Sequence, residues 1–286
     1  MDKVFVCSDL DRTILPNGLQ LESEAARPLL RRLAGHSDII IAYVSGRDKA
    51  LLQDAIREYD IPPPDYAVGD VGSTIYAIND GRWHVSEKWE QTISPCWKGR
   101  RHDELAAMLT DITELRMQEK QKQNTFKLSY YVDPRENIDA LLAEVKKRLE
   151  GEEIDASVIW SVDETENIGL LDILPACATK LHAVRFLMEL TGVDRERTVY
   201  AGDSGNDLPV LTSDLQTVLV KNATEDVRKQ AVSGKKQAGH RDLLYLADGG
   251  FLGLNGNYTA GVLEGVAHFI PELEEVLRRY CQESAE

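Results

Sequence analysis

The chain has 286 residues, enough for one large domain or two smaller ones with a buried core. Its 33 basic and 48 acidic residues give a net charge of −15, which argues against nucleic acid or an anionic membrane as its main partner. No apolar run approaches the length of a membrane span, and the polar first residues do not resemble a signal peptide, so we expect a cytoplasmic protein.

Strand and helix patterns alternate in the N-terminal part of the chain. The apolar periodicity predicts strands at 4–10, 38–44 and 66–68 and helices at 22–33 and 48–59. Alternation of this kind predicts an α/β protein whose core is a Rossmann-like, doubly wound parallel sheet.

The pattern changes from about residue 75, where turn residues at 79–81 predict a hairpin. The next segments predict a helix at 102–119, a strand at 126–132, a helix at 137–150 and a strand at 157–160. Apolar and polar residues alternate in these strands, which predicts an antiparallel sheet with helices on one face.

The α/β pattern then resumes towards the C-terminus. It predicts strands at 169–174, 198–202 and 217–220, helices at 180–191 and from Asp207, and a last helical pair. The polar, basic segment 233–240 is predicted to be a surface loop. We therefore expect two domains: a discontinuous core of residues 1–84 and 170–286, and an inserted α+β cap domain of residues 85–169.

Two carboxylates lie where the first strand ends. Asp9 and Asp11 are two residues apart, so on a strand they share a face, at the sheet edge where α/β proteins place their chemistry. With Asp9 attacking a phosphoryl group, Asp11 would protonate the leaving oxygen and later activate water. An isolated pair can equally cap a turn, so this alternative stays open.

Two further segments offer groups for a phosphate. Ser45 and Gly46 lie between an apolar strand and a helix, where a hydroxyl and backbone N–H groups can cradle phosphate. Lys180 opens a helix, where its charge opposes the helix dipole, and neutralising phosphate and Asp9 would explain that placement. An ordinary N-cap serine and a solvated lysine are the alternatives.

A second acidic turn follows the strand predicted at 198–202. Asp203 and Asp207 are four residues apart around a tight turn, so both can reach one ion. Oxygen ligands favour a hard cation, and Mg²⁺ is the usual partner of phosphoryl chemistry. Gly202 and Gly205 suggest a special backbone geometry, which argues against an ordinary surface turn.

The cysteines and histidines show no ligand spacing. Cys7, Cys96, Cys177 and Cys281 are widely scattered, which predicts buried or incidental thiols and neither a disulfide framework nor a zinc site. The six histidines also lack the spacing of a metal site.

Together these motifs resemble those of haloacid dehalogenase superfamily phosphohydrolases. The shared motifs are D-x-D-x-T at 9–13, a hydroxyl at Ser45, the lysine at Lys180 and G-D-x-x-x-D at 202–207. The insertion between the second and third motifs resembles the branch with a large α+β cap. Within that branch the chain is most similar to the sucrose-phosphate phosphatase family, over nearly its whole length. The matching stretches are 8–11, 64–66, 71–76, 127–130, 133–134, 172–175, 202–207 and 261–269.

The resemblance implies a Mg²⁺-dependent phosphatase that converts a sugar phosphate, expected to be sucrose 6-phosphate, through an aspartyl-phosphate intermediate. The alternatives are a phosphatase for mannosylfructose phosphate or glucosylglycerol phosphate, a phosphosugar mutase, and a non-catalytic sugar-phosphate-binding partner of a glycosyltransferase. A sugar-phosphate synthase is a candidate partner. Arg12 and Ser45 stand where the family often has Asn and Thr.

The resemblance also implies a role for individual residues. These are Asp9 as nucleophile; Asp11 as acid and base; Ser45, Gly46, Lys180 and Asn206 for phosphate; Asp9, Asp11 through its carbonyl, Asp203 and Asp207 for the metal; and Asn124 and Lys127 for the sugar.

Overall fold

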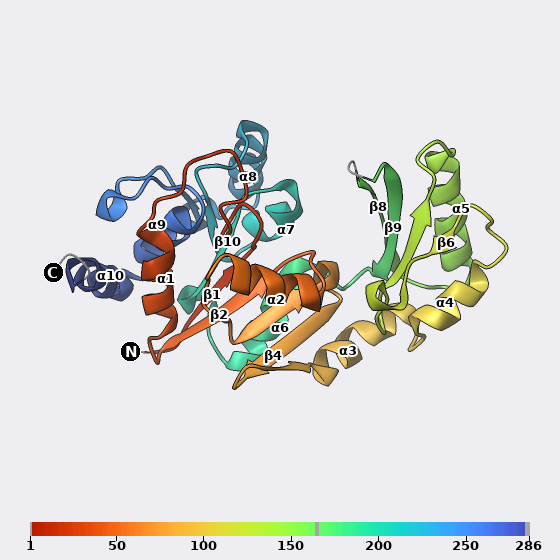
Figure 1. Ribbon diagram of the computed structural model, residues 1–286, viewed down its shortest axis with the longest axis horizontal. Helices are drawn as coiled ribbons and strands as arrows, with labels where there is room; N and C mark the ends of the chain where they lie inside the picture. Colours follow the sequence, from red (N-terminus) through yellow and green to blue (C-terminus); the bar gives the residue numbers. More distant parts are fainter. Residues whose placement is uncertain (1, 164–165, 284–286) are drawn as a thin grey trace.

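An eight-stranded sheet forms the larger part of the molecule (Figure 1). The computed structural model describes residues 2–163 and 166–283. The strand order is β12-β11-β10-β1-β2-β3-β4-β5; the β3–β4 and β4–β5 pairings are antiparallel, and the other pairings are parallel. The strands are β1 (Val4–Ser8), β2 (Ile39–Val44), β3 (Tyr66–Gly69), β4 (Thr74–Asn79), β5 (Arg82–Val85), β10 (Thr198–Gly202), β11 (Gln216–Leu219) and β12 (Leu244–Leu246).

Helices cover both faces of this sheet. Val4 and Val6 of β1 belong to one apolar cluster with α1, α2, α9 and α10, whereas Phe5 and Cys7 belong to another with α6 and α7. A strand buried on both faces is a continuous apolar run, as β1 is. The predicted α/β, doubly wound core is therefore confirmed. The helices are α1 (Ala26–Ala34), α2 (Lys49–Glu58), α6 (Lys180–Thr191), α7 (Leu208–Leu211), α8 (Glu225–Gln237), α9 (Thr259–Phe269) and α10 (Pro271–Glu283).

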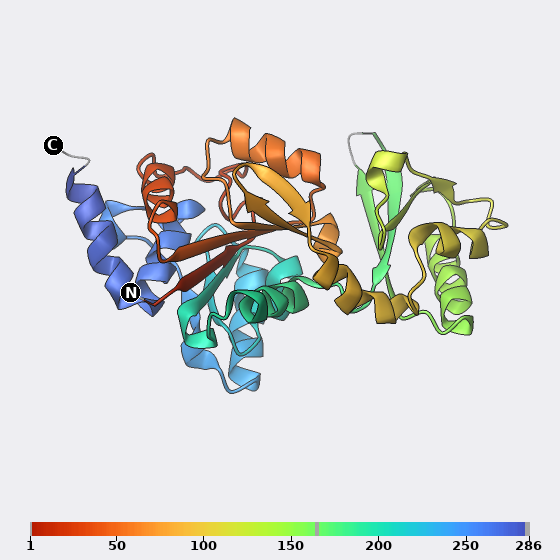
Figure 2. The same cartoon turned by 90° about the horizontal axis from the view of Figure 1, so that it is seen from below.

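A second, four-stranded sheet lies at the end of the molecule away from α9 and α10 (Figures 1 and 2). Its order is β6-β7-β9-β8 and its pairings are antiparallel. Helices α4 and α5 pack on one face, as predicted, and contribute to an apolar cluster with Tyr130, Val132 and Leu171. The elements are α4 (His102–Met108), β6 (Arg116–Met117), β7 (Leu128–Val132), α5 (Ile138–Gly151), β8 (Ala156–Asp163) and β9 (Ile168–Pro175). Among the described residues, no helix is long and apolar enough to cross a membrane.

Two predictions in this region are wrong. The strand expected at 169–174 exists as β9, but it pairs with β7 and β8 and not with the core sheet, so the boundary predicted at 169/170 cuts a strand of the second sheet. Its apolar pattern fits either sheet, because periodicity does not identify the neighbouring strand. The helix expected at 102–119 ends at Met108, and Arg116 and Met117 pair with β7 instead. Tertiary pairing overrides local propensity there.

The segment 233–240 is also not the loop that was predicted, because α8 continues to Gln237. Ala231 and Lys235 are buried on one side of this helix, although the segment is polar by composition. Gly234 does not interrupt the helix. A Cβ there would lie 2.4 Å from Cγ2 of Thr212, so glycine allows α8 to pack closely on α7 and the turn after it.

A disulfide joins Cys96 to Cys177, 81 residues apart in the sequence. The prediction that the cysteines are free thiols is therefore wrong for Cys96 and Cys177. It holds for Cys7 and Cys281, which are free. Spacing rules detect cysteines that are close in sequence. Cys96 and Cys177 instead lie in the two separate segments where the chain passes between the sheets.

Candidate active site

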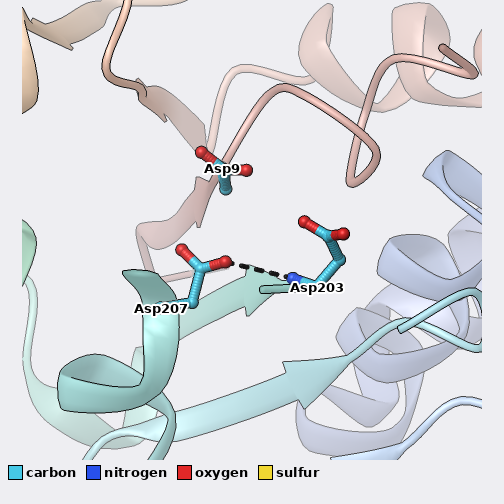
Figure 3. Close-up of side chains that lie close together, drawn as sticks. All are labelled: Asp9, Asp203 and Asp207. Carbon is cyan, nitrogen blue, oxygen red and sulfur yellow. Dashed lines mark hydrogen bonds between the residues drawn. The ribbon is translucent and has the colours of Figure 1, made fainter. Parts of the chain in front are cut away.

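Three buried carboxylates meet at the carboxyl ends of β1 and β10 (Figure 3). Asp9 follows β1, and Asp203 and Asp207 follow β10, its parallel neighbour. Each offers an oxygen within 4.8 Å of those of the other two. Carboxyl ends of adjacent parallel strands share one edge of a sheet, so the topology brings these distant residues together.

Lys180 binds two of these carboxylates. Its Nζ lies 2.7 Å from Oδ1 of Asp9 and 2.8 Å from Oδ1 of Asp207. Burial disfavours the charged amine, but the two carboxylates outweigh burial and raise its pKa above the ordinary lysine value. Thr179 caps α6 by accepting a hydrogen bond from the N–H of His182, which fixes Lys180 as the first residue of the helix.

Both oxygens of Asp207 have several hydrogen-bond partners. Oδ1 accepts from Lys180 and, at 2.6 Å, from the hydroxyl of Tyr200. Oδ2 accepts from the N–H of Asp203 and from the N–H and hydroxyl of Ser204, each at 3.1 Å. Burial opposes its ionisation, but Lys180 and these donors prevail and lower its pKa. Asp207 therefore holds Lys180 and the turn after β10 in position.

Gly202 allows this turn to close over Asp207. A Cβ at position 202 would lie 2.5 Å from Cγ of Asp207, a distance that side chains do not tolerate. Gly205 has no atom within 4 Å of the equivalent position. Of the two glycines predicted to have a special backbone geometry, only Gly202 lies where a side chain would clash.

Burial raises the pKa of Asp9 to about 7, against the opposing effect of Lys180. Burial and the charge of Asp207 raise the pKa of Asp203 to about 6. Arg12, with Nε 3.3 Å from Oδ2 of Asp203, partly offsets this. The three carboxylates outnumber the two cations beside them, Lys180 and Arg12, and a cluster of carboxylate oxygens suits a hard divalent cation.

The Asp11 carboxylate lies outside this cluster of three. Arg47 donates two hydrogen bonds to it, at 2.9 and 2.6 Å, and the amide of Asn17 donates a third at 2.7 Å. Burial opposes its ionisation, but Arg47 outweighs burial and lowers its pKa. The charged form of Asp11 is therefore held towards Arg47.

Ser45 and Gly46 lie at the carboxyl end of β2, on the same edge of the sheet. Ser45 is 1% exposed, and its Oγ accepts a hydrogen bond from the N–H of Arg47 at 3.2 Å. Asp48, and not Ser45, caps α2, because its side chain accepts from the N–H of Leu51. The alternative in which Ser45 is an ordinary helix cap is therefore excluded.

A cavity of about 1050 Å³ opens between the two sheets above these residues. The core contributes Asp9, Asp11, Arg12, Ser45, Gly46, Arg47, Lys180, Asp203 and Asn206, among others. The second sheet contributes Ser157, Ile159, Trp160, Ser161, Asp172 and Leu174, from β8 and β9. Sequence reasoning missed this second group. Its signal is the alternation along β8 and β9, which exposes serine and aliphatic side chains on the face opposite α4 and α5.

Asn124 and Lys127, predicted to bind sugar, are not among the described residues that line this cavity. The amide of Asn124 donates to the hydroxyls of Ser73 and Thr74, at 3.2 and 3.0 Å. Lys127 is 7% exposed, and its Nζ lies 3.6 Å from the buried carboxylate of Asp70. The structure therefore brings both residues to a contact between the second sheet's domain and the core.

Comparisons with known proteins agree with this arrangement. The family model described as sucrose-6F-phosphate phosphohydrolase matches residues 2–270. A protein named HAD-like hydrolase from Nitrosococcus oceani is 57% identical over 99% of this chain and 76% of its own length. The mannosylfructose-phosphate phosphatase of Agrobacterium fabrum is 26% identical over 93% of this chain and 96% of its own.

Among solved structures, the sucrose-phosphatase of Synechocystis, in complex with sucrose and phosphate, has the same fold. It superposes with a TM-score of 0.66 at 24% identity, over 94% of this chain and 98% of that chain.

Proposed function

The chain belongs to the sucrose-6F-phosphate phosphohydrolase family, and we propose that it hydrolyses sucrose 6-phosphate to sucrose and phosphate. It is a sugar-phosphate phosphatase of the haloacid dehalogenase superfamily. One observation carries the proposal: Lys180 bridges Asp9 and Asp207 on the floor of a cavity whose opposite wall is the second sheet.

Asp9 is the proposed nucleophile. Its carboxylate attacks phosphorus and forms an acyl phosphate, while the sugar oxygen departs. Lys180 neutralises charge on the carboxylate and the phosphate. The Ser45 hydroxyl and the N–H groups at Gly46 bind phosphate oxygens, supported by their position at the same sheet edge, and Asn206 also lines the cavity.

Asp11 is the proposed acid and base. It protonates the departing sugar oxygen and then removes a proton from the water that hydrolyses the acyl phosphate. Because Arg47 holds its carboxylate, Asp11 must be released from Arg47 before it can carry a proton to the substrate. We expect an arriving phosphate, which competes for Arg47, to cause that release.

Asp9 and Asp203 would hold a Mg²⁺ ion, with a backbone carbonyl of Asp11 as a further ligand. The three carboxylates of the cluster, Asp207 included, offer oxygens within 4.8 Å of one another, and this geometry supports the choice. A bound Mg²⁺ supplies Lewis-acid polarisation of the phosphoryl oxygens. Asp207, predicted as a ligand, supports the site through Lys180 and the turn after β10.

The substrate assignment rests on the family and on the cavity. A space of about 1050 Å³ is ample for a disaccharide phosphate. Ser157, Ser161 and Asp172 offer polar groups to a sugar, and Ile159 and Leu174 offer apolar surface. Mannosylfructose phosphate is the second candidate, since a phosphatase named for it matches nearly the whole chain. Cytoplasmic location, and a sugar-phosphate synthase as a partner, remain predictions.

Phosphate release from a panel of substrates tests the assignment. The panel contains sucrose 6-phosphate, mannosylfructose phosphate, glucosylglycerol phosphate and simple hexose phosphates. We expect the highest kcat/KM with sucrose 6-phosphate, and release of phosphate without an isomerised sugar phosphate, which separates a phosphatase from a mutase. Equal rates on all substrates would indicate a generalist and overturn the specific claim. No release from any of them would favour a binding protein.

A further inference from the structure

The chain crosses between the two sheets twice (Figures 1 and 2). The first crossing runs from β5 through α3 (Glu87–Ile93) and a turn at Ser94–Trp97. The second, residues 176–179, joins β9 to α6. Cys96 lies in the first crossing and Cys177 in the second, with their Cα atoms 6.5 Å apart. The disulfide therefore closes a covalent loop that contains the whole second sheet with α4 and α5.

Non-covalent contacts also link the two crossings indirectly, through Asp155, which lies just before β8, and through packing of α3 on α6. The N–H of Asp155 donates to the carbonyl of Cys96 at 2.8 Å, and the N–H of Ala176 donates to the carbonyl of Asp155 at 3.0 Å. The rings of Trp89, in α3, and Phe186, in α6, have centroids 5.1 Å apart. Loss of the disulfide would leave these contacts in place, so it would loosen the crossings without separating them.

Cys177 lies three residues before Lys180. Its carbonyl accepts a hydrogen bond from the N–H of Thr179 at 3.1 Å, and Thr179 is the residue that caps α6. A restraint on Cys177 therefore acts on the start of the helix that presents Lys180 to Asp9.

Neither cysteine of the bond is a fully buried residue. Cys96 and Cys177 are both partly exposed, whereas the free Cys7 is fully buried. A dithiol can attack one protein sulfur, which forms a mixed disulfide and releases the other protein sulfur as a thiolate. The second thiol then attacks the dithiol's own sulfur in the mixed disulfide and displaces the protein sulfur that was attacked first. Two electrons and two protons pass to the protein, leaving two cysteine thiols, and the dithiol becomes a disulfide. Oxidation by a disulfide compound reverses each step.

We propose that Cys96 and Cys177 form a reversible redox site, a clamp on both crossings that controls how far the second sheet can open from the core. Opening of a cap requires backbone torsion changes in its connecting segments, and joining both segments restricts those changes. The oxidised enzyme opens less and releases product more slowly, and reduction by a dithiol raises kcat. This effect on turnover rests on the proposed phosphatase function.

The test compares oxidised and dithiothreitol-reduced wild-type protein, with the disulfide verified by mass spectrometry. Hydrogen exchange of the backbone amides at 86–99 and 175–180 measures the clamp without any substrate. Phosphate release from sucrose 6-phosphate measures its effect on turnover. We expect faster exchange at both crossings after reduction, and a rise in kcat of roughly twofold or more.

Two variants complete the design. Cys96→Ser/Cys177→Ser should behave like the reduced wild type and no longer respond to dithiothreitol. Cys281→Ser, which changes a free cysteine in α10, should keep the full response.

The outcomes separate the clamp from the phosphatase function. Unchanged exchange after reduction would overturn the clamp, and so would faster exchange in an enzyme that releases phosphate with the same kcat in both states. Two free thiols at Cys96 and Cys177 under oxidising conditions would also overturn it. Faster exchange in a protein that releases no phosphate in either state would support the clamp and overturn the proposed function. Because chemical reduction leaves the sequence unchanged, the test does not depend on the folding of a variant.

Discussion

Gly202 lies directly against the carboxyl group of Asp207, and this contact makes it sensitive to a single added methyl group. In Gly202→Ala the new Cβ would fall 2.5 Å from Cγ of Asp207, so Asp207 and the turn must shift. We expect a loss of about 1–3 kcal/mol in the free energy of unfolding, as for other overpacked sites. Urea unfolding measures this loss, and kcat should fall with it, because Asp207 positions Lys180.

Gly205→Ala is the matched control, three residues along the same turn. No atom lies within 4 Å of its added Cβ, so its unfolding free energy should stay within about 0.5 kcal/mol of wild type. Similar losses in both variants would show that the turn is sensitive to any side chain, and not to the contact with Asp207.

Single residues differ in how far the sequence reveals them. Asp9, Lys180, Asp203 and Asp207 could be predicted to meet, because each lies in the turn after a parallel strand or at the start of a helix, at one edge of the sheet. The pairing of the Asp11 carboxylate with Arg47 could not, since it depends on side-chain orientation.

A substitution at Lys127 can distinguish sugar binding from a structural role in joining the second domain to the core. Its amine is buried 3.6 Å from the carboxylate of Asp70. Lys127→Met should lower the free energy of unfolding by up to about 3 kcal/mol, because it leaves a buried carboxylate without its cation. Burial already raises the pKa of Asp70, so protonation limits the loss. Thermal unfolding and steady-state kinetics provide the measurement.

Lys120→Met is the control, since Lys120 is exposed on the preceding turn. It should change neither stability nor KM. A large rise in KM for Lys127→Met at unchanged stability would contradict the structural role and restore sugar binding as its function.

The packing of α8 predicts an unusual pH dependence of stability. Lys235 is fully buried and donates to the carbonyls of Ser213 and Leu215, at 2.7 and 2.6 Å. Burial lowers its pKa from 10.5 to about 8. Between these values the unfolded chain binds more protons than the folded protein, so the free energy of unfolding should rise with pH, by at most about 1.4 kcal/mol per unit.

Denaturant unfolding of wild type and Lys235→Met, from pH 7.5 to 10.5, isolates this contribution. The difference in stability, wild type minus variant, should increase across the range. A difference that is constant with pH would show that Lys235 keeps its ordinary pKa in the folded protein.

Helices and strands also differ in how far the sequence predicts them. Those of the core could be predicted, because a strand buried on both faces and an amphipathic helix have distinct patterns, and α6 begins and ends where periodicity places it. The sheet to which β9 belongs could not be predicted, because its neighbours are set by long-range pairing. The helix predicted beyond Met108 does not form there, because Arg116 and Met117 pair with β7.

In the whole molecule, the proposed function assigns phosphate chemistry and sugar selection to different parts of the chain. The core supplies Asp9 and Lys180, and the open face of β8 and β9 supplies the opposite wall of the cavity. The first part could be predicted from motifs. The second could not, because which face of a sheet is left open depends on where α4 and α5 pack. The disulfide that links the two crossings could not be predicted either, because its cysteines are 81 residues apart and meet only in the folded chain.

The proposed phosphatase mechanism depends on Asp9 forming a bond to phosphorus. The most direct test is the rate of phosphate release from sucrose 6-phosphate, with Mg²⁺, by wild type and by Asp9→Asn. Wild type should turn over and stop when EDTA removes the metal, whereas Asp9→Asn should release no phosphate while its circular dichroism spectrum matches that of wild type. Full activity in Asp9→Asn would contradict the account.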